Sequence, residues 1–494
     1  MNNVSSPVPT TTDLIGFYAR STPDKVALRW GDNSCTFAQL YAQLTQCTAF
    51  LHHQLQAVAK DSLVAVASED FFGQWISLLA LEGLGRCTVS VMTSEVNAEF
   101  VRQFSVGALI APQAQALPVP VIAVNAQTLA AHRSESGNTP PEQDRYQGTA
   151  LRLLRTSGTT GESKRIVLDR RMWSGWTDSW DWYCNYGPQS VCMIQHPFSI
   201  GGVYATSSAC LRAGGTVVKR DGRPFVQALQ DFGVSHATLL PMDLGGIAKS
   251  LPQAPAVTRK IMLTSFGGVL PADMVQQALA GFAHHVVDMY GTNEVAFIGA
   301  QIAALGAQAQ PGIGLWPGVD VAIVDEQDQR VPAGEIGYIK VRTPLMATRY
   351  EGDPKATETL FRKGWFWPGD LGRMLPNGRL ELTGRIDDLI NVGGIKVNPA
   401  LAEAKLCALD YVRDAAVITV PWPDRPQTVV IVVTFEGPGQ LQRLQKETAA
   451  SMAAFDHLVE WEQLDSIPRT PTGKVQRAAL REQLLARRAA AGKR

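Results

Sequence analysis

A loop rich in glycine, serine and threonine follows an apolar run at residues 153–164 and ends on a lysine. It reads Leu-Leu-Arg-Thr-Ser-Gly-Thr-Thr-Gly-Glu-Ser-Lys. Glycines let backbone amides approach an anion, hydroxyls add donors and the lysine adds a mobile positive charge, so the loop suits a polyphosphate. It is not a Walker A loop, because Gly158 and Gly161 are only three residues apart and Lys164 follows a serine. On composition alone, a flexible turn is an equal alternative.

Three further polar segments follow this loop in order and extend to residue 477. They are Tyr290-Gly-Thr-Asn-Glu294, Trp367-Pro-Gly-Asp370 with Thr383-Gly-Arg-Ile-Asp-Asp-Leu-Ile390, and Pro468-Arg-Thr-Pro-Thr-Gly-Lys474-Val-Gln-Arg477. Any one of them could arise by chance. The ordered set resembles the acyl-adenylate-forming superfamily, which comprises acyl- and aryl-CoA synthetases, adenylation domains and beetle luciferases. The resemblance covers nearly the whole chain.

The resemblance implies a two-step reaction of a small-molecule carboxylic acid. A carboxylate is a poor electrophile, so these enzymes first let it attack the α-phosphate of ATP, which gives acyl-AMP and pyrophosphate. The acyl group then passes to a thiol, with coenzyme A as the first choice and the phosphopantetheine of an acidic carrier protein as the runner-up. Negative charge accumulates at the α-phosphate, so Mg²⁺ and lysine side chains are expected to offset it. A luciferase-like oxygenase and a degenerate, non-catalytic ligase are the remaining alternatives.

The residues that bind ATP follow from the same resemblance. Tyr290 is expected to pack on adenine and Glu294 to bind Mg²⁺. Two residues depart from the pattern: Ser163 stands where proline is usual, and Asn293 where a phosphate-contacting threonine is usual, although an amide can still donate to phosphate. The expected ATP-binding residues are Thr156, Ser157, Gly158, Thr159, Thr160, Gly161, Lys164, Gly267, Gly268, Asp288, Tyr290, Gly291, Thr292, Asn293, Asp370 and Arg385.

Asp370 matches the family aspartate that accepts hydrogen bonds from the ribose hydroxyls, and Arg385 matches the arginine that reaches ribose and phosphate. The expected catalytic residues are Lys474, Lys164, Glu294 and Arg385.

The C-terminal motifs imply a small domain that moves between the two steps. Asp387 matches the family hinge, where a few residues absorb the rotation. Lys474 matches the lysine that bridges the carboxylate and the α-phosphate. Gly393 and Gly394 match the loop that lines the thiol tunnel in the second conformation.

The segment 195–202, Gln-His-Pro-Phe-Ser-Ile-Gly-Gly, corresponds to part of the family's acyl pocket. Adenylation domains for α-amino acids commonly place an aspartate directly after an aromatic residue there, where it pairs the substrate ammonium. Here Ser199 follows Phe198, so an aryl, fatty or other acid with an uncharged tail is favoured. The expected pocket residues are His196, Phe198, Ser199, Gly202 and Ser265.

Two features near this segment have a structural alternative. His196 could steer a thiol or a polar substrate group, although a lone histidine beside an apolar strand is more often structural. Trp173, Trp176 and Trp180 have helical spacing, which favours core packing over pocket lining.

Short apolar runs alternate with amphipathic stretches over residues 62–290, which predicts α/β layers with largely parallel sheets. The expected strands are 63–67, 108–110, 121–124, 191–194, 216–218, 237–240, 260–263 and 286–289, and the expected helices include 74–84, 203–213 and 272–282. Residues 133–148 are polar and indicate a surface loop. Short strands with turns over 312–341 indicate a β-rich subdomain. We therefore expect a large N-terminal AMP-binding domain at 1–384 and a small, mobile α+β domain at 385–494.

The composition narrows the function classes. The chain has 494 residues with 45 basic and 45 acidic side chains, and this balance argues against a dedicated nucleic-acid binder. Its seven cysteines show no zinc or disulfide spacing. No signal peptide or apolar run long enough to span a bilayer is visible, so a cytoplasmic protein is expected. Residues 466–494 carry eight basic residues and one acid, a net charge of +7 that could attract CoA phosphates or an acidic carrier protein.

Overall fold

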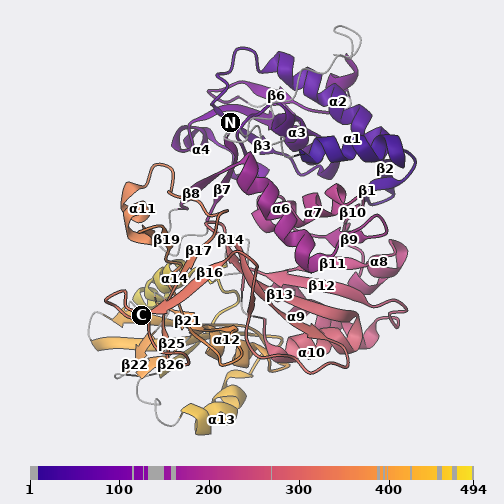
Figure 1. The fold of residues 1–494 in the computed structure, drawn as a ribbon. Helices are drawn as coiled ribbons and strands as arrows, with labels where there is room; N and C mark the ends of the chain where they lie inside the picture. Colours follow the sequence, from indigo (N-terminus) through magenta and orange to yellow (C-terminus); the bar gives the residue numbers. More distant parts are fainter. Residues whose placement is uncertain are drawn as a thin grey trace.

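The computed structural model describes residues 9–491 except 114–115, 126, 132–149, 157–162, 269, 387–389, 393–394, 398, 423–424, 453–458 and 470–474. The predicted loop at 133–148 lies outside the described residues. Two large sheets and their helices form the upper and middle parts of the molecule in Figure 1, and the C-terminal elements lie below them. The predicted α/β fold, with a β-rich part and a smaller C-terminal part, is confirmed.

The first sheet has six strands, in which β7 and β8 pair antiparallel and the other pairs are parallel. Its order is β6 (Val121–Ala123), β5 (Val106–Ala111), β3 (Leu63–Ala67), β4 (Thr88–Val91), β7 (Ala150–Arg155) and β8 (Arg165–Asp169). Helices α2 (Phe37–Gln54), α3 (Phe71–Gly83) and α4 (Ala98–Gln103) accompany it. Burial of the parallel strands explains why their sequences are continuous apolar runs.

The second sheet has nine strands with a parallel centre and antiparallel edges. Its order is β15 (Gly314–Leu315), β14 (Ala296–Ala304), β13 (Ala283–Thr292), β12 (Ile261–Phe266), β11 (His236–Leu239), β9 (Val191–Ile194), β10 (Thr216–Lys219), β1 (Val26–Trp30) and β2 (Asn33–Thr36). The helices of this region are α1 (Thr11–Ser21), α6 (Arg170–Cys184), α7 (Gly201–Arg212), α8 (Phe225–Asp231), α9 (Pro241–Ser250) and α10 (Ala272–Gly281).

Residues 320–385 form a third, antiparallel sheet, as the β-rich pattern predicts. It contains β16 (Asp320–Val324), β17 (Gly337–Arg342), β18 (Phe361–Arg362), β19 (Trp365–Phe366), β20 (Asp370–Met374) and β21 (Leu380–Arg385), with helix α11 (Pro354–Leu360) before β18. Beyond it lie β22 (Ile390–Val392), β23 (Ile395–Val397), α12 (Pro399–Cys407), β24 (Val412–Trp422), β25 (Arg425–Phe435), α13 (Leu441–Met452), β26 (Val459–Gln463) and α14 (Arg477–Ala491). Strands β24, β25 and β26 form one sheet.

The tryptophan stripe belongs to the core, as its helical spacing favours. Helix α6 begins after Asp169, whose side chain accepts a hydrogen bond from the amide of Met172. Trp173, Trp176 and Trp180 are then all buried on one side of the helix. Their burial packs one face of α6 into the hydrophobic core.

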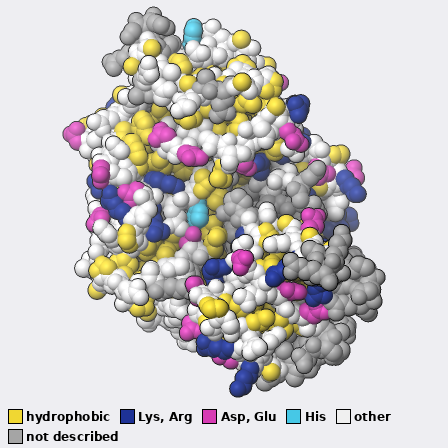
Figure 2. Space-filling view, turned by 180° about the vertical axis from the view of Figure 1, so that it is seen from behind, with side chains coloured by type: hydrophobic (Ala, Val, Ile, Leu, Met, Phe, Trp, Pro, Cys, Tyr) yellow, Lys and Arg dark blue, Asp and Glu magenta, His cyan; other side chains and the backbone are white. Residues whose placement is uncertain are grey.

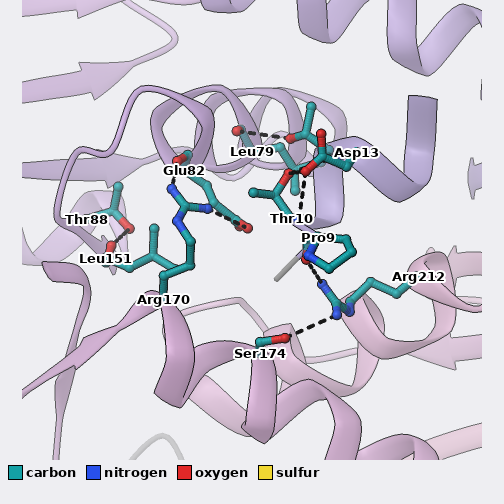
Figure 3. Close-up of polar contacts among 11 residues, drawn as sticks. Pro9, Thr10, Asp13, Leu79, Glu82, Thr88, Leu151, Arg170, Ser174 and Arg212 are labelled. Atoms are coloured by element: carbon teal, nitrogen blue, oxygen red, sulfur yellow. Dashed lines mark hydrogen bonds and ion pairs between the residues drawn. The ribbon is translucent and has the colours of Figure 1, made fainter. Parts of the chain in front are cut away.

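A buried ion pair joins α3 of the first sheet to α6. Nη1 of Arg170 lies 3.9 Å from Oε1 of Glu82, and Nη2 donates to the Glu82 carbonyl at 2.8 Å (Figure 3). Nearby, Arg212 of α7 donates to the Pro9 carbonyl at 3.1 Å and to Ser174 Oγ at 3.2 Å. Polar contacts therefore reinforce the apolar packing between the N-terminal helices and α6.

All seven cysteines are free thiols, and six of them are buried. Cys407 of α12 is partly exposed, and burial raises the pKa of its thiol to about 11. Over the described ranges, no group of three or more histidine, cysteine or acidic side chains is arranged to hold a metal ion.

We expect Glu82→Gln to lower the free energy of unfolding by about 3 kcal/mol, because it leaves the buried Arg170 guanidinium without its counter-charge. Urea unfolding followed by tryptophan fluorescence measures the change. The matched control is Asp320→Asn, which breaks the exposed Arg342–Asp320 pair and should cost less than about 1 kcal/mol. Equal effects of the two substitutions would contradict a role for the buried pair.

Candidate active site

Three side chains from two sheets meet at Asp370. The hydroxyl of Tyr290, near the end of β13, donates to Oδ2 of Asp370 at 2.5 Å. Arg385 lies opposite Asp370 across the β20–β21 pair, and its Nη1 is 3.1 Å from Oδ1. The turn before Asp370 contains Gly369 at a φ of +79°, a conformation that favours glycine. The structure thus brings together the three residues expected to hold the nucleoside.

The electrostatics of this cluster keep Tyr290 a hydrogen-bond donor. Burial, together with the adjacent negative charge of Asp370, raises the pKa of Tyr290 well above its usual value. The hydroxyl therefore remains protonated at neutral pH and donates to the carboxylate. A charge-assisted bond of this kind is stronger than one between neutral groups.

Glu294 lies in the tight connection between β13 and β14. A Cβ at Gly291 would lie 2.3 Å from the carbonyl oxygen of Ala296, so this turn requires glycine. The Glu294 amide donates to Thr292 Oγ1 at 3.3 Å, and its carbonyl accepts the amide of Ala347 at 2.7 Å. The residue as a whole is only 8% exposed. These contacts hold the expected Mg²⁺ ligand in one place.

Tyr350 contacts the two residues expected to meet the phosphates and the metal. Its hydroxyl donates to Oε1 of Glu294 at 2.7 Å. Nζ of Lys164 lies 5.6 Å from the centre of its ring. Burial and then the negative charge of Glu294 raise the pKa of Tyr350 far above its usual value. The sequence motifs did not point to this residue, because a lone tyrosine in the polar stretch 349–353 has no distinctive spacing.

Asn293 ties the Glu294 turn to the phosphate loop. Its Nδ2 donates to the carbonyl of Arg155 at 3.1 Å, and Arg155 is the last residue of β7 before that loop. The base of the loop is closed by the amide of Thr156, which donates to the carbonyl of Lys164 at 2.9 Å. The amide that replaces the family's threonine therefore bridges the first two sheets.

Several expected site residues lie outside the described residues. They are Ser157, Gly158, Thr159, Thr160, Gly161, Asp387, Gly393, Gly394 and Lys474. Their roles stay predictions.

Four of the five expected acyl-pocket residues lie just before α7 or in its first turn, and the fifth, Ser265, is fully buried on β12. The ring of Phe198 faces the core, where its centre lies 4.9 Å from that of Trp75 and 5.0 Å from that of Tyr204. A Cβ at Gly202 would lie 2.7 Å from the ring of Phe266, so this glycine makes room for the phenylalanine. Ser199 is partly exposed. Phe198 therefore packs the core behind the segment, while Gly202 lets Phe266 approach α7.

His196 is paired with an acid from α9. Its Nε2 lies 2.7 Å from Oδ2 of Asp243, and the same oxygen accepts the amide of Leu240 at 2.7 Å. Figure 2 shows a hollow across the middle of the rear face, with hydrophobic side chains and a histidine in it. The pairing with Asp243 fixes the ring of His196 at the start of α9.

The remaining adenine-side residues follow β12 and β13. Asp288 lies opposite Ser265 in the register of these strands. Burial raises the pKa of Asp288 to about 7. Gly267, with a φ of +88°, and Gly268 follow β12 directly. The carboxyl ends of the parallel strands thus gather these residues at one edge of the sheet, where ligands of open α/β sheets bind.

The comparison with protein families gives one match, to the AMP-binding enzyme family over residues 17–351. The chain belongs to the AMP-binding enzyme family. As the sequence predicts, it is an AMP-forming acid–thiol ligase. Over the part of the chain that the structure describes, no helix combines the length and apolar character needed to cross a bilayer.

Curated relatives cover most of the chain. The 4-chlorobenzoate–CoA ligase of Arthrobacter sp. is 26% identical over 96% of this chain and 95% of its own length. The medium/long-chain-fatty-acid–[acyl-carrier-protein] ligase FadD10 of Mycobacterium tuberculosis is 24% identical over 95% of each chain. The fatty acid–[acyl-carrier-protein] ligase ScoC of Streptomyces coeruleorubidus is 27% identical over 76% of this chain and 75% of its own length. The family thus includes both acceptor types.

Solved structures share the fold. ATP-bound MatB from Rhodopseudomonas palustris superposes with a TM-score of 0.80 at 22% identity, over 96% of this chain and 99% of that chain. The o-succinylbenzoate CoA synthetase MenE from Bacillus subtilis gives a TM-score of 0.79 at 21% identity, over 94% and 97%.

We expect Asp288→Asn to change how stability depends on pH. Between about pH 4 and pH 7 the carboxyl is protonated in the folded protein but ionised in the unfolded chain, so this group makes stability fall as the pH rises through that window. Asparagine has the same shape but no charge. The free energy of unfolding of the variant, minus that of the native protein, should therefore rise by about 2–4 kcal/mol when the pH is raised from 4 to 8. Thermal unfolding of both proteins at pH 4 and at pH 8 tests this. The same difference in stability between the two proteins at both pH values would contradict it.

Proposed function

We propose that this chain activates an aryl, fatty or other uncharged-tail carboxylic acid as its acyl-adenylate and transfers the acyl group to coenzyme A. The observation that carries the proposal is the convergence of two small clusters from separate sheets. One cluster joins Tyr290, Asp370 and Arg385, and the other joins Lys164, Tyr350 and Glu294. The first suits a nucleoside and the second suits a metal-bound polyphosphate.

In the first cluster, each side chain has a role toward the nucleoside of ATP. The Asp370 carboxylate would accept hydrogen bonds from the ribose hydroxyls, and Arg385 would offer its guanidinium to the ribose and the α-phosphate. The ring of Tyr290 would pack on adenine, while its hydroxyl holds Asp370. Fixing the nucleoside in this way would present the α-phosphate to the acid in a constant orientation.

In the second cluster, the buried Glu294 carboxylate is a hard oxygen ligand of the kind that Mg²⁺ prefers. The residues present therefore fit the metal, which would supply charge to offset the developing negative charge on the α-phosphate. Lys164 would bind the outer phosphates together with the glycine-rich loop. Lys474 would bridge the attacking carboxylate and the α-phosphate, a proposal that rests on its sequence motif.

The choice of acid rests on the segment before α7. Phe198 is followed by Ser199 where a carboxylate would pair an α-ammonium group. The named acid of one relative is an aryl acid, 4-chlorobenzoate, and that of another is a medium- or long-chain fatty acid. Both have the uncharged tail that the proposal requires.

The charge of the C-terminal segment bears on the thiol acceptor. Three of its arginines are paired with acids: Arg469 with Asp414, Arg477 with Glu403, and Arg488 with Glu460 and Glu462. Two more donate to backbone carbonyls. Five of the eight basic residues of the segment therefore contact other C-terminal residues, and Arg481, Arg487 and Arg488 join α14 to β24 and β26. These pairings weaken the charge argument for coenzyme A and for an acidic carrier protein alike, so coenzyme A stays the first choice on the sequence resemblance.

We also propose the domain division at 384/385, with the hinge near Asp387 and a mobile C-terminal domain. Two hydrophobic clusters support it, because their members all fall within residues 390–484. The last buried residue, in sequence order, of the large hydrophobic cluster shared by the other sheets is Leu380. Separate cores are what a domain that reorients as a body requires.

Carboxylate-dependent pyrophosphate release is the decisive assay for this activity. We expect release with aryl or fatty acids and a loss of at least about 100-fold in Lys474→Ala, because the attacking carboxylate loses its electrostatic partner. A panel of aryl, short-chain, long-chain and amino acids would define the substrate. Intact ATP binding without release for any acid would overturn the proposal. Mass spectrometry of the product with CoA, and with acyl carrier proteins, separates the two acceptors.

A further inference from the structure

Tyr350 lies where three sheets meet. Its hydroxyl contacts Glu294, in the turn that leaves β13 of the nine-stranded sheet. Its ring faces Lys164, which directly precedes β8 of the six-stranded parallel sheet. Its own segment leads into α11 of the antiparallel sheet region. One side chain thus contacts both residues to which the family pattern gives the phosphate and metal roles.

The backbone on both sides of Tyr350 is fixed to the same partners. The amide of Glu351 donates to the carbonyl of Arg165 at 2.9 Å, next to Lys164. The amide of Ala347 donates to the carbonyl of Glu294 at 2.7 Å. The amide of Tyr350 itself donates to Thr357 Oγ1 of α11 at 2.9 Å. The placement of the ring is therefore determined by the strands that carry its two partners.

The chemistry of the side chain goes beyond filling space. Packing alone would be met by phenylalanine, because the ring of Tyr350 also lies edge-on to Phe361, with centroids 5.3 Å apart. The hydroxyl instead occupies one carboxylate oxygen of Glu294. Among the described side chains, none is hydrogen-bonded to the other oxygen, Oε2. The ring face meanwhile attracts the Lys164 ammonium.

We propose that Tyr350 is a positioning residue that orients Glu294 toward the metal through its hydroxyl and holds Lys164 toward the phosphates through its ring. This inference rests on the proposed function and adds to it a residue that couples the two halves of the polyphosphate site. The two contacts use different parts of the side chain. They can therefore be removed one at a time.

Tyr350→Phe removes the hydroxyl and keeps the ring. Second-sphere partners of metal ligands are worth about 10–100-fold in metal affinity, so we expect MgATP to bind at least about tenfold more weakly while ATP in EDTA binds as before. Isothermal titration calorimetry measures both without turnover. The matched control is Tyr186→Phe, which deletes a buried tyrosine hydroxyl hydrogen-bonded to Thr206 at 2.6 Å, away from the two clusters. It should leave both affinities unchanged.

Tyr350→Leu removes the ring as well. The loss of the cation–π contact should weaken binding of metal-free ATP by about threefold in addition to the magnesium effect. Far-UV circular dichroism and thermal unfolding verify that each variant is folded. If Tyr350→Leu prevents folding, Tyr350→Phe and Glu294→Gln are compared singly and combined: the double variant should bind MgATP little more weakly than Glu294→Gln alone, because both substitutions act on one contact.

The binding experiments distinguish a failure of the positioning role of Tyr350 from a failure of the proposed function. Native protein that binds no ATP at all would overturn the proposed function. Native protein that binds MgATP, with Tyr350→Phe binding it equally well, would overturn the positioning role alone. An equal loss of affinity for ATP with and without Mg²⁺ in Tyr350→Phe would also overturn it, because the hydroxyl would then act only through packing.

Discussion

The hydrogen bond from Tyr290 to Asp370 is the contact on which the candidate site depends. It joins the end of a parallel strand in the nine-stranded sheet to the first residue of an antiparallel strand 80 residues later. Asp370 is almost fully buried, so its carboxylate must find donors within the protein. Tyr290 and Arg385 supply them from two different sheets. The cluster of Tyr290, Asp370 and Arg385 therefore forms only when the two sheets have packed together, which links the candidate site directly to the completed fold.

Polar contacts also cross the boundary between the first two sheets. Asn293 donates across it to the backbone of Arg155, and the Arg170–Glu82 pair joins helices α6 and α3. A single hydrophobic cluster includes members of all three large sheets, such as Val66, Ile194 and Ile339. Close packing resists small displacements, so a core shared in this way transmits the position of one sheet to the others. The C-terminal residues pack into two hydrophobic clusters of their own.

How far the sequence anticipates this structure depends on the kind of signal. Val191–Ile194 and Leu63–Ala67 coincide with predicted strands, because buried parallel strands are continuous apolar runs bounded by polar residues. The helix predicted at 74–84 begins earlier, at Phe71, since Asp70 caps it and no periodicity marks a cap. The role of Tyr350 is not visible in the sequence, because its partners Glu294 and Lys164 are far away along the chain. The ion pairs of the basic C-terminus are not visible in the sequence for a similar reason: a net charge counts arginines without showing that Asp414 or Glu403 pairs them.

The burial of the cysteines has a practical consequence for measuring whether the C-terminal part moves relative to the rest of the chain. Six thiols are shielded from reagents, and the seventh, Cys407, carries almost no thiolate at neutral pH because its pKa is about 11. A maleimide dye would therefore find few competing targets on the folded protein. Two cysteines introduced on the surface, one on either side of residue 385, could carry a donor and an acceptor fluorophore. Energy transfer between them would report the distance between the two parts, molecule by molecule, as each substrate is added.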